Sequence, residues 1–360
     1  MKEPVVLHLI QGLSLMGGTP AKLFTLVSYS KHKHIVFCCE NELNRQNLSL
    51  WKKQCTVIQG MRPNRIGHNV SIIKDIVKEY GVNIIHVYFP PETFLCGFLK
   101  IRFPNIRFVR SFEGNFQLCL LKRILTNWAL SKFDRAVYIS NYIGNCYAHS
   151  IPESLVRKGL VIYNSASREP KHKNVIHHDV DKKRLLYVAG LNSHKNPLIL
   201  VDVMKILRAR GVDAHLDYVG DGPLRLPLEN KIKREGLGDY VTLQGYCANV
   251  VEFLNDCSVY LHPADNEGFG IAVVEAMQQS CPIIVSNKGG VTEIINDGVD
   301  GFIADAYNAN DWVDKIEHIL NNQELADRLG YAAYESAYSK FSIANYVNGH
   351  DEMYKALLKG

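Results

Sequence analysis

The sequence predicts an α/β protein of two Rossmann-like, doubly wound domains that face each other across a cleft. Three observations support this fold class: short apolar runs alternate with segments of helical periodicity, the alternation occurs in two blocks, and the polar stretch 167–184 separates the blocks. Such alternation is typical of parallel sheets with helices on both faces. Ligands of these sheets bind beyond the carboxyl ends of the strands, so two facing domains would form a cleft.

The first block contains five apolar runs of strand length. They are residues 5–10, 34–39, 82–89, 106–111 and 135–140. Helical segments lie between several of them, for example residues 69–80, in which four aliphatic residues share one face. We therefore expect a first domain over residues 1–166 and a linker over residues 167–183.

The second block repeats this pattern. Its strand-like runs are residues 185–190, 214–220, 240–245, 257–262 and 281–286. Residues 197–211 form an amphipathic helical pattern that ends at a glycine, a common helix stop. We expect the second domain over residues 184–340, and a C-terminal helix over residues 341–360 that packs back towards the first domain.

The composition is that of a soluble globular protein, with 47% hydrophobic and 21% charged residues in a chain of 360. No run of about 18 apolar residues could span a bilayer, and the first apolar run is too short for a signal peptide. The nine cysteines include no C-x-x-C pair. These observations favour a cytoplasmic protein with reduced thiols.

The charge is distributed unevenly along the chain. Residues 1–165 contain 21 Lys and Arg against 9 Asp and Glu, a net charge of +12, whereas residues 166–360 have a net charge of −7. A basic half suggests an anionic partner, either nucleic acid or an anionic membrane surface. Nucleic acid is disfavoured because no recognition motif is present and the charges are scattered over several elements.

The segment 119–135 predicts a basic amphipathic helix with one tryptophan. Such a helix can lie in a membrane interface. The more common arrangement, which we expect here, is that its apolar face packs into the protein core.

The stretch NEGFGIAVVE, residues 266–275, places a glycine-rich turn between an apolar strand and an apolar helix. Gly268 and Gly270 allow the backbone to approach a ligand closely. The backbone N–H groups near Phe269, Gly270 and Ile271, with the positive end of the helix, can bind an anion such as a phosphate.

Two carboxylates bracket this turn: Glu267 before it, and Glu275 about one turn into the helix. A carboxylate among apolar residues is unfavourable unless donors reach it, and the hydroxyls of a vicinal diol such as a ribose are suitable donors. One acid could hold a ribose and the other a sugar, which indicates a nucleoside diphosphate sugar. The alternative is structural, because the helix dipole favours an acid at Glu267 and Glu275 could lie on the surface.

The same residues resemble the retaining glycosyltransferases of family 4, which have the GT-B fold and two glutamates separated by seven residues. In this chain the motif reads EGFGIAVVEAM, from Glu267 to Met277. Further segments follow the family order: YVAGLNSHKNP (187–197), GDGPLR (220–225), VTLQGY (241–246) and GGVTEIINDGVDGFI (289–303). The resemblance thus covers most of residues 185–305, and it is looser in the first domain.

The resemblance implies a role for each residue around the turn. Glu267 would contact hydroxyls of the donor sugar, Glu275 the ribose, and Lys195 the departing diphosphate, where a cation stabilises the growing negative charge. The implied nucleotide-binding set is Gly17, Gly18, Gly190, Asn192, Lys195, Gly220, Tyr246, Glu267, Gly268, Phe269, Gly270, Ile271 and Glu275. Neither a metal nor another cofactor is implied, since basic groups replace the divalent ion in this family.

Two positions depart from the family pattern. Gly190 stands where the family usually has an arginine, so one cation is missing beside the diphosphate; His194 or a residue of the basic half could replace it, or the enzyme could be slow or inactive. Glu113 stands where many relatives have a histidine near the reacting sugar. We count Lys195, Glu267 and Glu113 as catalytic candidates. Glu113 and His86, the latter expected at a strand end facing the cleft, are candidates on the acceptor side, although Glu113 could equally be a surface acid.

These expectations describe a cytoplasmic, metal-independent, retaining hexosyltransferase that uses a nucleotide sugar, with UDP favoured over GDP as a property of the family. Residues 1–166 would receive a lipid-linked saccharide acceptor in surface polysaccharide, O-antigen, capsule or lipopolysaccharide biosynthesis, in peripheral contact with the anionic inner leaflet. A nucleotide-sugar epimerase of the same architecture and a non-catalytic sugar-binding or membrane-surface protein remain alternatives. A dinucleotide-dependent oxidoreductase is disfavoured, because the first turn lacks G-x-G-x-x-G.

Overall fold

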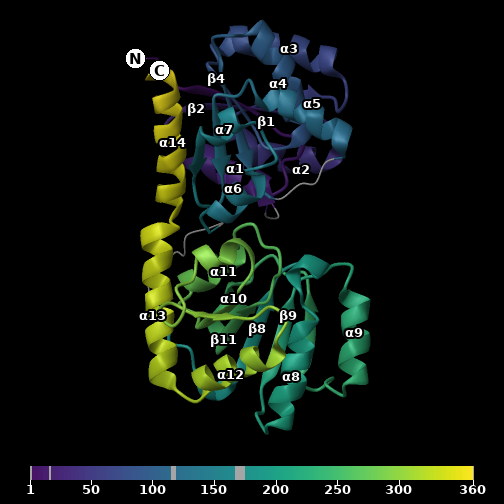
Figure 1. Cartoon of the computed structure of the whole chain (residues 1–360), viewed down its shortest axis with the longest axis vertical. Helices are drawn as coiled ribbons and strands as arrows, with labels where there is room; N and C mark the ends of the chain where they lie inside the picture. Colours follow the sequence, from purple (N-terminus) through teal and green to yellow (C-terminus); the bar gives the residue numbers. More distant parts are fainter. Residues whose placement is uncertain (1, 16–17, 115–118, 167–174, 360) are drawn as a thin grey trace. The chain divides into compact units, whose positions relative to one another are not determined.

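The computed structural model describes residues 2–15, 18–114, 119–166 and 175–359. These residues form two compact units (Figure 1). The first unit is built from the chain up to residue 166 together with the residues from 343 onwards, and the second from residues 175–342. Each unit contains one parallel sheet with its own hydrophobic core.

The first unit contains a seven-stranded parallel sheet in the order β3-β2-β1-β4-β5-β6-β7. The strands are β1 (Val5–Leu9), β2 (Lys33–Cys39), β3 (Thr56–Met61), β4 (Ile84–Val87), β5 (Arg107–Phe112), β6 (Arg135–Tyr138) and β7 (Gly159–Val161). The order reverses between β1 and β4, which pair through Val6 and Ile84. Such a switch point separates two loops at the carboxyl edge and is the usual place for a ligand.

Helices connect these strands in sequence. They are α1 (Gly18–Tyr29), α2 (Glu42–Lys52), α3 (Ile66–Tyr80), α4 (Pro90–Arg102), α5 (Leu120–Leu130), α6 (Asn141–Tyr147) and α7 (Glu153–Val156). Their ends follow from local chemistry. The side chain of Asn41 accepts a hydrogen bond from the backbone N–H of Asn44 at the start of α2, and α3 ends at Gly81 with a φ of 69°, the left-handed conformation that glycine adopts readily.

Helix α14 (Ile343–Lys359), the last element of the chain, completes the first unit (Figure 1). It packs against α1. Ser30 donates a hydrogen bond to the Asp351 carboxylate at 2.6 Å, and the Tyr354 hydroxyl lies 2.7 Å from His86 Nδ1. The final residues therefore contribute directly to the core around β1 and β4.

Four histidines are buried in this core, from β1, β2, β4 and α14. His8 Nε2 lies 2.8 Å from His34 Nδ1, and the ring of His86 stacks at 6.0 Å on that of His350. Burial lowers the pKa of His34 and of His350 to about 4. It also holds the pKa of His8 and of His86 well below the ordinary value, so that the neutral imidazole is favoured at all four positions.

The second unit contains a six-stranded parallel sheet in the order β10-β9-β8-β11-β12-β13. Its strands are β8 (Arg184–Val188), β9 (His215–Val219), β10 (Val241–Gly245), β11 (Val259–His262), β12 (Ile283–Ser286) and β13 (Phe302–Ala304). Its helices are α8 (Ile199–Ala209), α9 (Arg225–Arg234), α10 (Val251–Asp256), α11 (Ile271–Gln278), α12 (Ala309–Leu320) and α13 (Gln323–Lys340). Short 3-10 turns occur at Val180–Lys182, Ser193–Lys195 and Gly289–Glu293.

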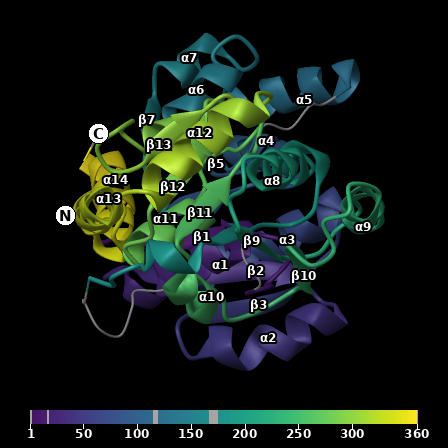
Figure 2. The same cartoon turned by 90° about the horizontal axis from the view of Figure 1, so that it is seen from below.

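The helices of the second unit lie on both faces of its sheet (Figure 2). Helices α8 and α12 pack against each other, as do α11 and α13. The aliphatic face of α8 is buried in the core, with Trp312 of α12 fully enclosed beside it. The predicted fold class, two Rossmann-like doubly wound α/β domains, is therefore confirmed, although the sequence patterns missed β3, β7 and β13.

Candidate functional site

The glycine turn follows β11 directly and opens α11, as the sequence predicted. Gly270 is the N-cap of the helix and has a φ of 111°. A Cβ atom there would lie 2.8 Å from Val291 Cγ1, so both the backbone conformation and the packing require glycine. The turn lies at the carboxyl edge of the sheet, at the N-terminus of α11, which is the positive end of the helix dipole.

The carboxylate of Glu267 is held by two cationic or hydrogen-bonding side chains. Lys195 Nζ forms an ion pair with Glu267 Oε2, and His262 Nε2 lies 3.2 Å from the same oxygen. Burial opposes the charge, but the hydrogen bond from His262 and the positive charge of Lys195 hold the pKa of Glu267 well below its usual range. Within the described part of the chain, no hydrogen bond engages the other oxygen, Oε1.

Backbone contacts fix the position of this pair. The N–H of Asp265 donates to His194 O at 3.1 Å, which joins the loop of Lys195 to the loop of Glu267. The N–H of Gly290 donates to Glu267 O at 2.7 Å. Gly289 has a φ of 77°, and a Cβ atom there would lie 2.5 Å from the same carbonyl oxygen. The GGVTEI segment (289–294) thus packs against the backbone of Glu267 and fixes its position.

The loops after β8, β9 and β10 lie at the same edge. Leu191 N–H donates to Asp221 O at 3.0 Å, and a Cβ atom on Gly220 would lie 2.0 Å from Ala189 O. These contacts bring the segments 189–192 and 220–222 together. Tyr246 follows β10 immediately, and 57% of its surface is exposed, which leaves its ring free to meet a ligand.

The structure brings together most of the predicted nucleotide-binding residues of the second unit. Gly190, Asn192, Lys195, Gly220, Tyr246 and the residues from Glu267 to Ile271 all follow strands at one edge of the sheet. Phe269 is buried and packs edge-on against Phe341 at 5.7 Å. Glu275 lies one turn into α11 and is only partly buried. This edge therefore carries a helix N-terminus and the Lys195–Glu267 pair, with Glu275 one turn further along α11.

The candidates of the first unit are less uniform. Gly17 lies outside the described residues, and Gly18, with a φ of 70°, begins α1. His86 was expected to face an acceptor, but it is fully buried in the middle of β4. Its ring nitrogens contact the hydroxyls of Tyr354 and Ser111 at 2.7 and 2.8 Å. Because helix α14 covers this strand, His86 is a core residue.

Glu113 follows β5 and is partly buried; with the buried cations Arg110 and Lys22 it forms a polar cluster that the sequence patterns did not reveal. Burial raises the pKa of Glu113 to about 7, against the attraction of Arg110 and Lys22. Arg110 is buried on β5, and Lys22 of α1 donates to the backbone oxygen of Ser165. A carboxyl group with this pKa can exchange a proton near neutral pH, so its environment suits a polar contact with a hydroxyl group.

His262 is the main residue that sequence reasoning undervalued. In the sequence, its position directly before Pro263 and five residues before Glu267 is as compatible with a structural role as with a functional one; in the structure it ends β11. Burial lowers the pKa of His262, and Glu267 partly restores it. The only sequence signal for its role was a polar residue at the carboxyl end of a buried strand, next to the motif.

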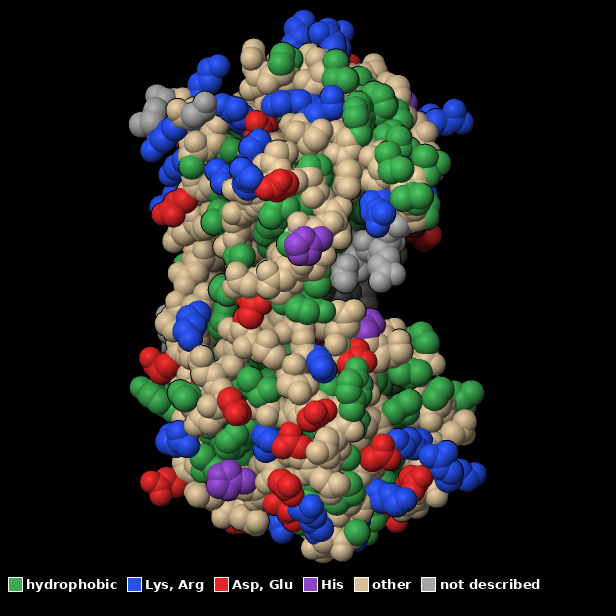
Figure 3. All heavy atoms as spheres, in the orientation of Figure 1, with side chains coloured by type: hydrophobic (Ala, Val, Ile, Leu, Met, Phe, Trp, Pro, Cys, Tyr) green, Lys and Arg blue, Asp and Glu red, His purple; other side chains and the backbone are tan. Residues whose placement is uncertain are grey.

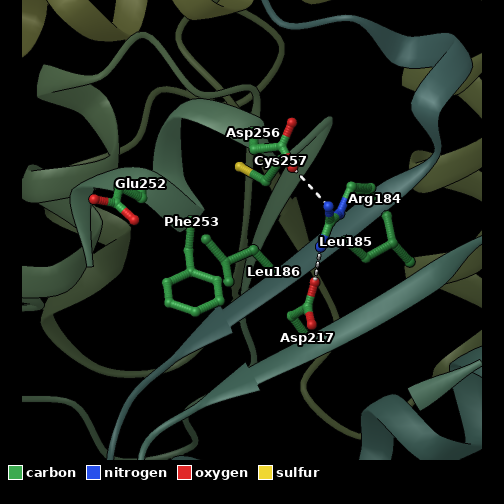
Figure 4. A pocket seen from close by; sticks show the side chains of 8 residues that line it. All are labelled: Arg184, Leu185, Leu186, Asp217, Glu252, Phe253, Asp256 and Cys257. Atoms are coloured by element: carbon green, nitrogen blue, oxygen red, sulfur yellow. Dashed lines mark hydrogen bonds and ion pairs between the residues drawn. The ribbon is translucent and has the colours of Figure 1, made fainter. Parts of the chain in front are cut away.

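A second feature of this unit lies away from the glycine turn. A cavity of about 230 Å³ lies towards the amino ends of β8 and β11. In its wall Arg184 bridges Asp217 and Asp256 at 2.9 and 2.6 Å, and Figure 4 shows these side chains. Its wall includes Cys257, whose sulfur is 3.7 Å from that of Cys281. No predicted site residue lines this cavity, and its ion-paired wall stabilises the start of the sheet.

Residues 168–336 match the family described as glycosyl transferases group 1. An uncharacterized glycosyltransferase from Methanocaldococcus jannaschii is 30% identical over 294 residues, which cover 80% of this chain and 79% of that protein. The capsular polysaccharide biosynthesis glycosyltransferase CapM of Staphylococcus aureus is 26% identical over 181 residues, 48% of this chain and 46% of CapM.

Solved structures share the fold. A glycosyltransferase from Rickettsia africae has a TM-score of 0.81 at 19% identity, over 100% of both chains. The Anabaena protein HepE in complex with UDP has a TM-score of 0.82 at 16% identity, over 98% of this chain and 100% of that chain. At these identities the similarity concerns the architecture of two doubly wound sheets.

Proposed function

Because this chain belongs to the glycosyl transferases of group 1 and has their GT-B fold, we propose that it transfers a hexose or N-acetylhexosamine from a nucleotide sugar, with retention of configuration. The observation that carries this proposal is the arrangement at Glu267. Lys195 and His262 both bind Oε2, and no hydrogen bond from a described residue engages Oε1, which we propose receives a sugar hydroxyl. A fixed, ionised carboxylate beside an anion-binding helix end suits a sugar joined to a diphosphate.

The donor is proposed to be a UDP-sugar. Its diphosphate would meet the N–H groups of Phe269, Gly270 and Ile271, its ribose Glu275, and its sugar Glu267. Lys195 would move from Glu267 towards the diphosphate as charge develops on the leaving group. UDP is supported by relatives of the same fold, since HepE is described in complex with UDP and with UDP-glucose.

The chemistry proposed needs no metal and no protein base at the acceptor. The departing phosphate oxygen takes the proton of the acceptor hydroxyl on the same face of the sugar, while Lys195 and the helix end stabilise the negative charge. Glu113 is proposed to orient a hydroxyl of the donor or the acceptor, because its carboxyl group titrates near neutral pH. With Gly190 in place of an arginine, the stabilisation of the leaving group depends more heavily on Lys195.

We propose a lipid-linked saccharide as the acceptor, in the synthesis of a surface polysaccharide or lipopolysaccharide at the inner face of the cytoplasmic membrane. Two relatives support a polysaccharide product: CapM, named for capsular polysaccharide biosynthesis, and the poly(ribitol-phosphate) α-N-acetylglucosaminyltransferase of Staphylococcus aureus. The identity of the sugar depends on a few contacts in the pocket.

The first experiment is calorimetric binding of UDP, GDP, ADP and NAD to the wild type and to Glu275→Ala. We expect selective binding of UDP, weakened about tenfold by the substitution because a ribose contact is lost. Glu324→Ala, a change of an exposed acid on α13, is the matched control and should bind as the wild type does. Binding of NAD alone, or UDP binding that is indifferent to Glu275, would contradict the proposal.

A second experiment separates the candidate activities. In the presence of a UDP-sugar and the absence of an acceptor, we expect slow hydrolysis to a free sugar with the anomeric configuration of the donor. NMR measures the reaction. A changed sugar still attached to UDP would indicate an epimerase. Tight UDP binding with no turnover of UDP-sugars on any saccharide acceptor would indicate a non-catalytic binding protein, the alternative that Gly190 raises.

A further inference from the structure

Helices α4 and α5 expose a continuous apolar surface, which we call the α4–α5 face. Its large side chains, with their exposed fractions, are Phe98 (39%), Ile101 (65%), Leu120 (65%), Leu121 (67%), Ile124 (56%), Leu125 (40%) and Trp128 (38%). In Figure 3 apolar side chains gather on the first unit over the region where Figure 1 places these helices. Contiguous exposed patches of this kind mark interaction sites.

The apolar face of α5 is exposed to solvent. Leu120, Leu121, Ile124, Leu125 and Trp128 recur at helical spacing and share one face. The residues that α5 buries are only Ala129 and Leu130, near its end. The expectation that the apolar face of residues 119–135 packs into the core is therefore wrong: the core side of this helix is short, and its larger apolar side faces solvent.

The face is anchored to the fold by Trp128. A Cβ atom on Gly97 would lie 2.5 Å from the Trp128 ring, so glycine in α4 gives the indole its place. Phe98 packs on the same ring, with centroids 5.2 Å apart. Helices α4 and α5 therefore pack against each other, and the exposed side chains lie on a packed helix pair rather than on a separate helix.

Cations surround the face, and acids are almost absent from it. Between residues 98 and 133 the sequence contains seven Lys and Arg and a single acid, Glu113, which is partly buried and attracted to Arg110 and Lys22. Lys100 and Arg107 are paired with Asp134, and Arg110 is buried. The remaining four cations form no ion pair within the described residues: Arg102, Lys122, Arg123 and Lys132.

We propose that the α4–α5 face docks on the surface of a bilayer that contains anionic lipids. Leucine, isoleucine and aromatic side chains would enter the headgroup boundary, while the unpaired cations bind lipid phosphates, as in interfacial amphipathic helices. Lys132 Nζ already lies 4.6 Å from the Trp128 ring centroid, an arrangement that places an aromatic ring and a cation at the same depth. A second copy of the chain is a poorer occupant, because isologous pairing would bring the same unpaired cations together.

Only the biological role of this docking rests on the proposed function: the α4–α5 face would bring the enzyme to a lipid-linked acceptor. The contact would be peripheral: no helix among the described residues combines the length and the apolar character needed to cross a bilayer. The test uses lipid alone, without donor or acceptor, so docking can fail while glycosyl transfer stands, and transfer can fail while docking stands.

The experiment is fluorescence titration of the full chain with vesicles. The sequence contains three tryptophans, of which Trp51 and Trp312 are fully buried whereas Trp128 is 38% exposed. A blue shift on addition of vesicles therefore reports Trp128 itself. We expect it with vesicles of phosphatidylcholine and phosphatidylglycerol, with quenching by brominated lipid, at least tenfold weaker binding to phosphatidylcholine alone, and loss of the signal in Trp128→Phe.

Two paired substitutions separate the apolar from the electrostatic contribution. Leu121→Ser/Ile124→Ser and Lys122→Ala/Arg123→Ala change exposed residues and leave the core intact, and each should weaken binding to anionic vesicles at least tenfold. Salt should weaken binding of the wild type and affect the charge variant less. The controls lie on α9 of the second unit: Leu226→Ser, 65% exposed, and Lys233→Ala/Arg234→Ala should bind as the wild type does.

Three results would overturn the inference. The first is no vesicle binding by the folded wild type at low salt. The second is binding that the α4–α5 variants and the α9 variants change equally. The third is a concentration-dependent dimer, seen by ultracentrifugation, that Leu121→Ser/Ile124→Ser dissociates, because the face would then be occupied by a second copy.

Discussion

Lys195 and Glu267 are ion-paired across two loops of the second sheet, and His262 contacts the same carboxylate oxygen at 3.2 Å. Two groups to which the family resemblance gives different ligands thus hold each other before any ligand arrives. The pair keeps the Lys195 side chain next to the glycine turn and keeps Glu267 ionised. A donor that draws the lysine to its diphosphate would receive a carboxylate already fixed for its sugar.

Replacement of Glu267 by glutamine should separate sugar recognition from nucleotide binding. We expect Glu267→Gln to lower kcat with a UDP-sugar by about 100-fold, because the charge that orients the sugar is lost, and to leave the Kd of UDP within about threefold. Turnover and calorimetry on the same preparation measure both. Glu229→Gln, which changes an exposed acid on α9, is the control. If Glu267→Gln weakened UDP binding by as much as it lowered kcat, this carboxylate would contact the nucleotide instead.

Lys195→Ala should impair both turnover and nucleotide binding. We expect a loss of about 100-fold in kcat and about tenfold weaker UDP binding, because the lysine acts on the diphosphate in both the bound and the departing state. Lys205→Ala removes an exposed lysine that pairs with Glu235 and should change neither constant. Full activity of Lys195→Ala would mean that another cation stabilises the leaving group.

Arginine at position 190 should strengthen the site. A Cβ atom there would lie 2.8 Å from Asn192 Nδ2, the free end of a side chain, so that a small movement of Asn192 makes room. We expect Gly190→Arg to tighten UDP binding about tenfold through an added charge-assisted contact to the diphosphate. The double variant Gly190→Arg/Asn192→Ala relieves the contact with Asn192. If both variants fold with unchanged melting temperatures and neither tightens UDP binding, position 190 does not face the diphosphate.

Gly270→Ala should destabilise the second unit. Its φ of 111° is unfavourable for alanine and the new methyl would meet Val291, so we expect a loss of about 1–3 kcal/mol in the free energy of unfolding and weaker UDP binding. Gly67→Ala is the matched control, because Gly67 lies in α3 with open space around it and should gain up to about 1 kcal/mol. Denaturant unfolding of the two variants gives the comparison, and a Gly270→Ala chain as stable as the wild type would mean that the turn adapts.

The buried histidines of the first unit predict acid sensitivity. Their pKa values are lowered in the folded chain, to about 4 for His34 and His350, against about 6.5 when unfolded. Between these values the unfolded chain binds more protons, so the free energy of unfolding should fall as pH drops from about 6.5 towards 4, by up to about 1.4 kcal/mol per pH unit for each histidine. Above pH 7 this contribution should be complete.

Thermal unfolding at pH 7.5 and 5.5, followed by circular dichroism, measures this effect. In a variant with His34→Gln the drop in melting temperature between the two pH values should be smaller than in the wild type, because one titrating group is gone. His149→Gln changes an exposed histidine after α6 and should leave the drop as it is. Equal melting temperatures of the wild type at both pH values would show that the cluster titrates normally.

The sequence predicted those elements whose pattern is local. Strands β1, β4, β11 and β12 are buried along almost their whole length and consist mostly of apolar residues, each with one histidine or serine. Strand β3 contains Gln59 and Gly60 and is only partly buried, so it carries no such signal. Strands β7 and β13 are three residues long, too short for a period to be recognised.

The candidate site was predictable to the level of the sheet edge, not of the contacts. Parallel strands direct their following loops to one edge, so the neighbourhood of Lys195 and Glu267 followed from the order of strands and helices. Their direct pairing depends on loop conformations set by Gly289 and by the backbone bond between Asp265 and His194, which no local pattern encodes. The burial of His86 was unpredictable for a related reason, since the hydroxyl that covers it belongs to Tyr354.

Helix α14 also has a consequence for how the chain is made. Strand β1 is synthesised long before the helix that closes its core, because Ser30 pairs with Asp351, 321 positions later in the chain. The second unit, continuous in sequence, can fold while the first waits unfinished. A nascent chain stalled before residue 343 should therefore carry one native sheet and one that exposes apolar surface to chaperones.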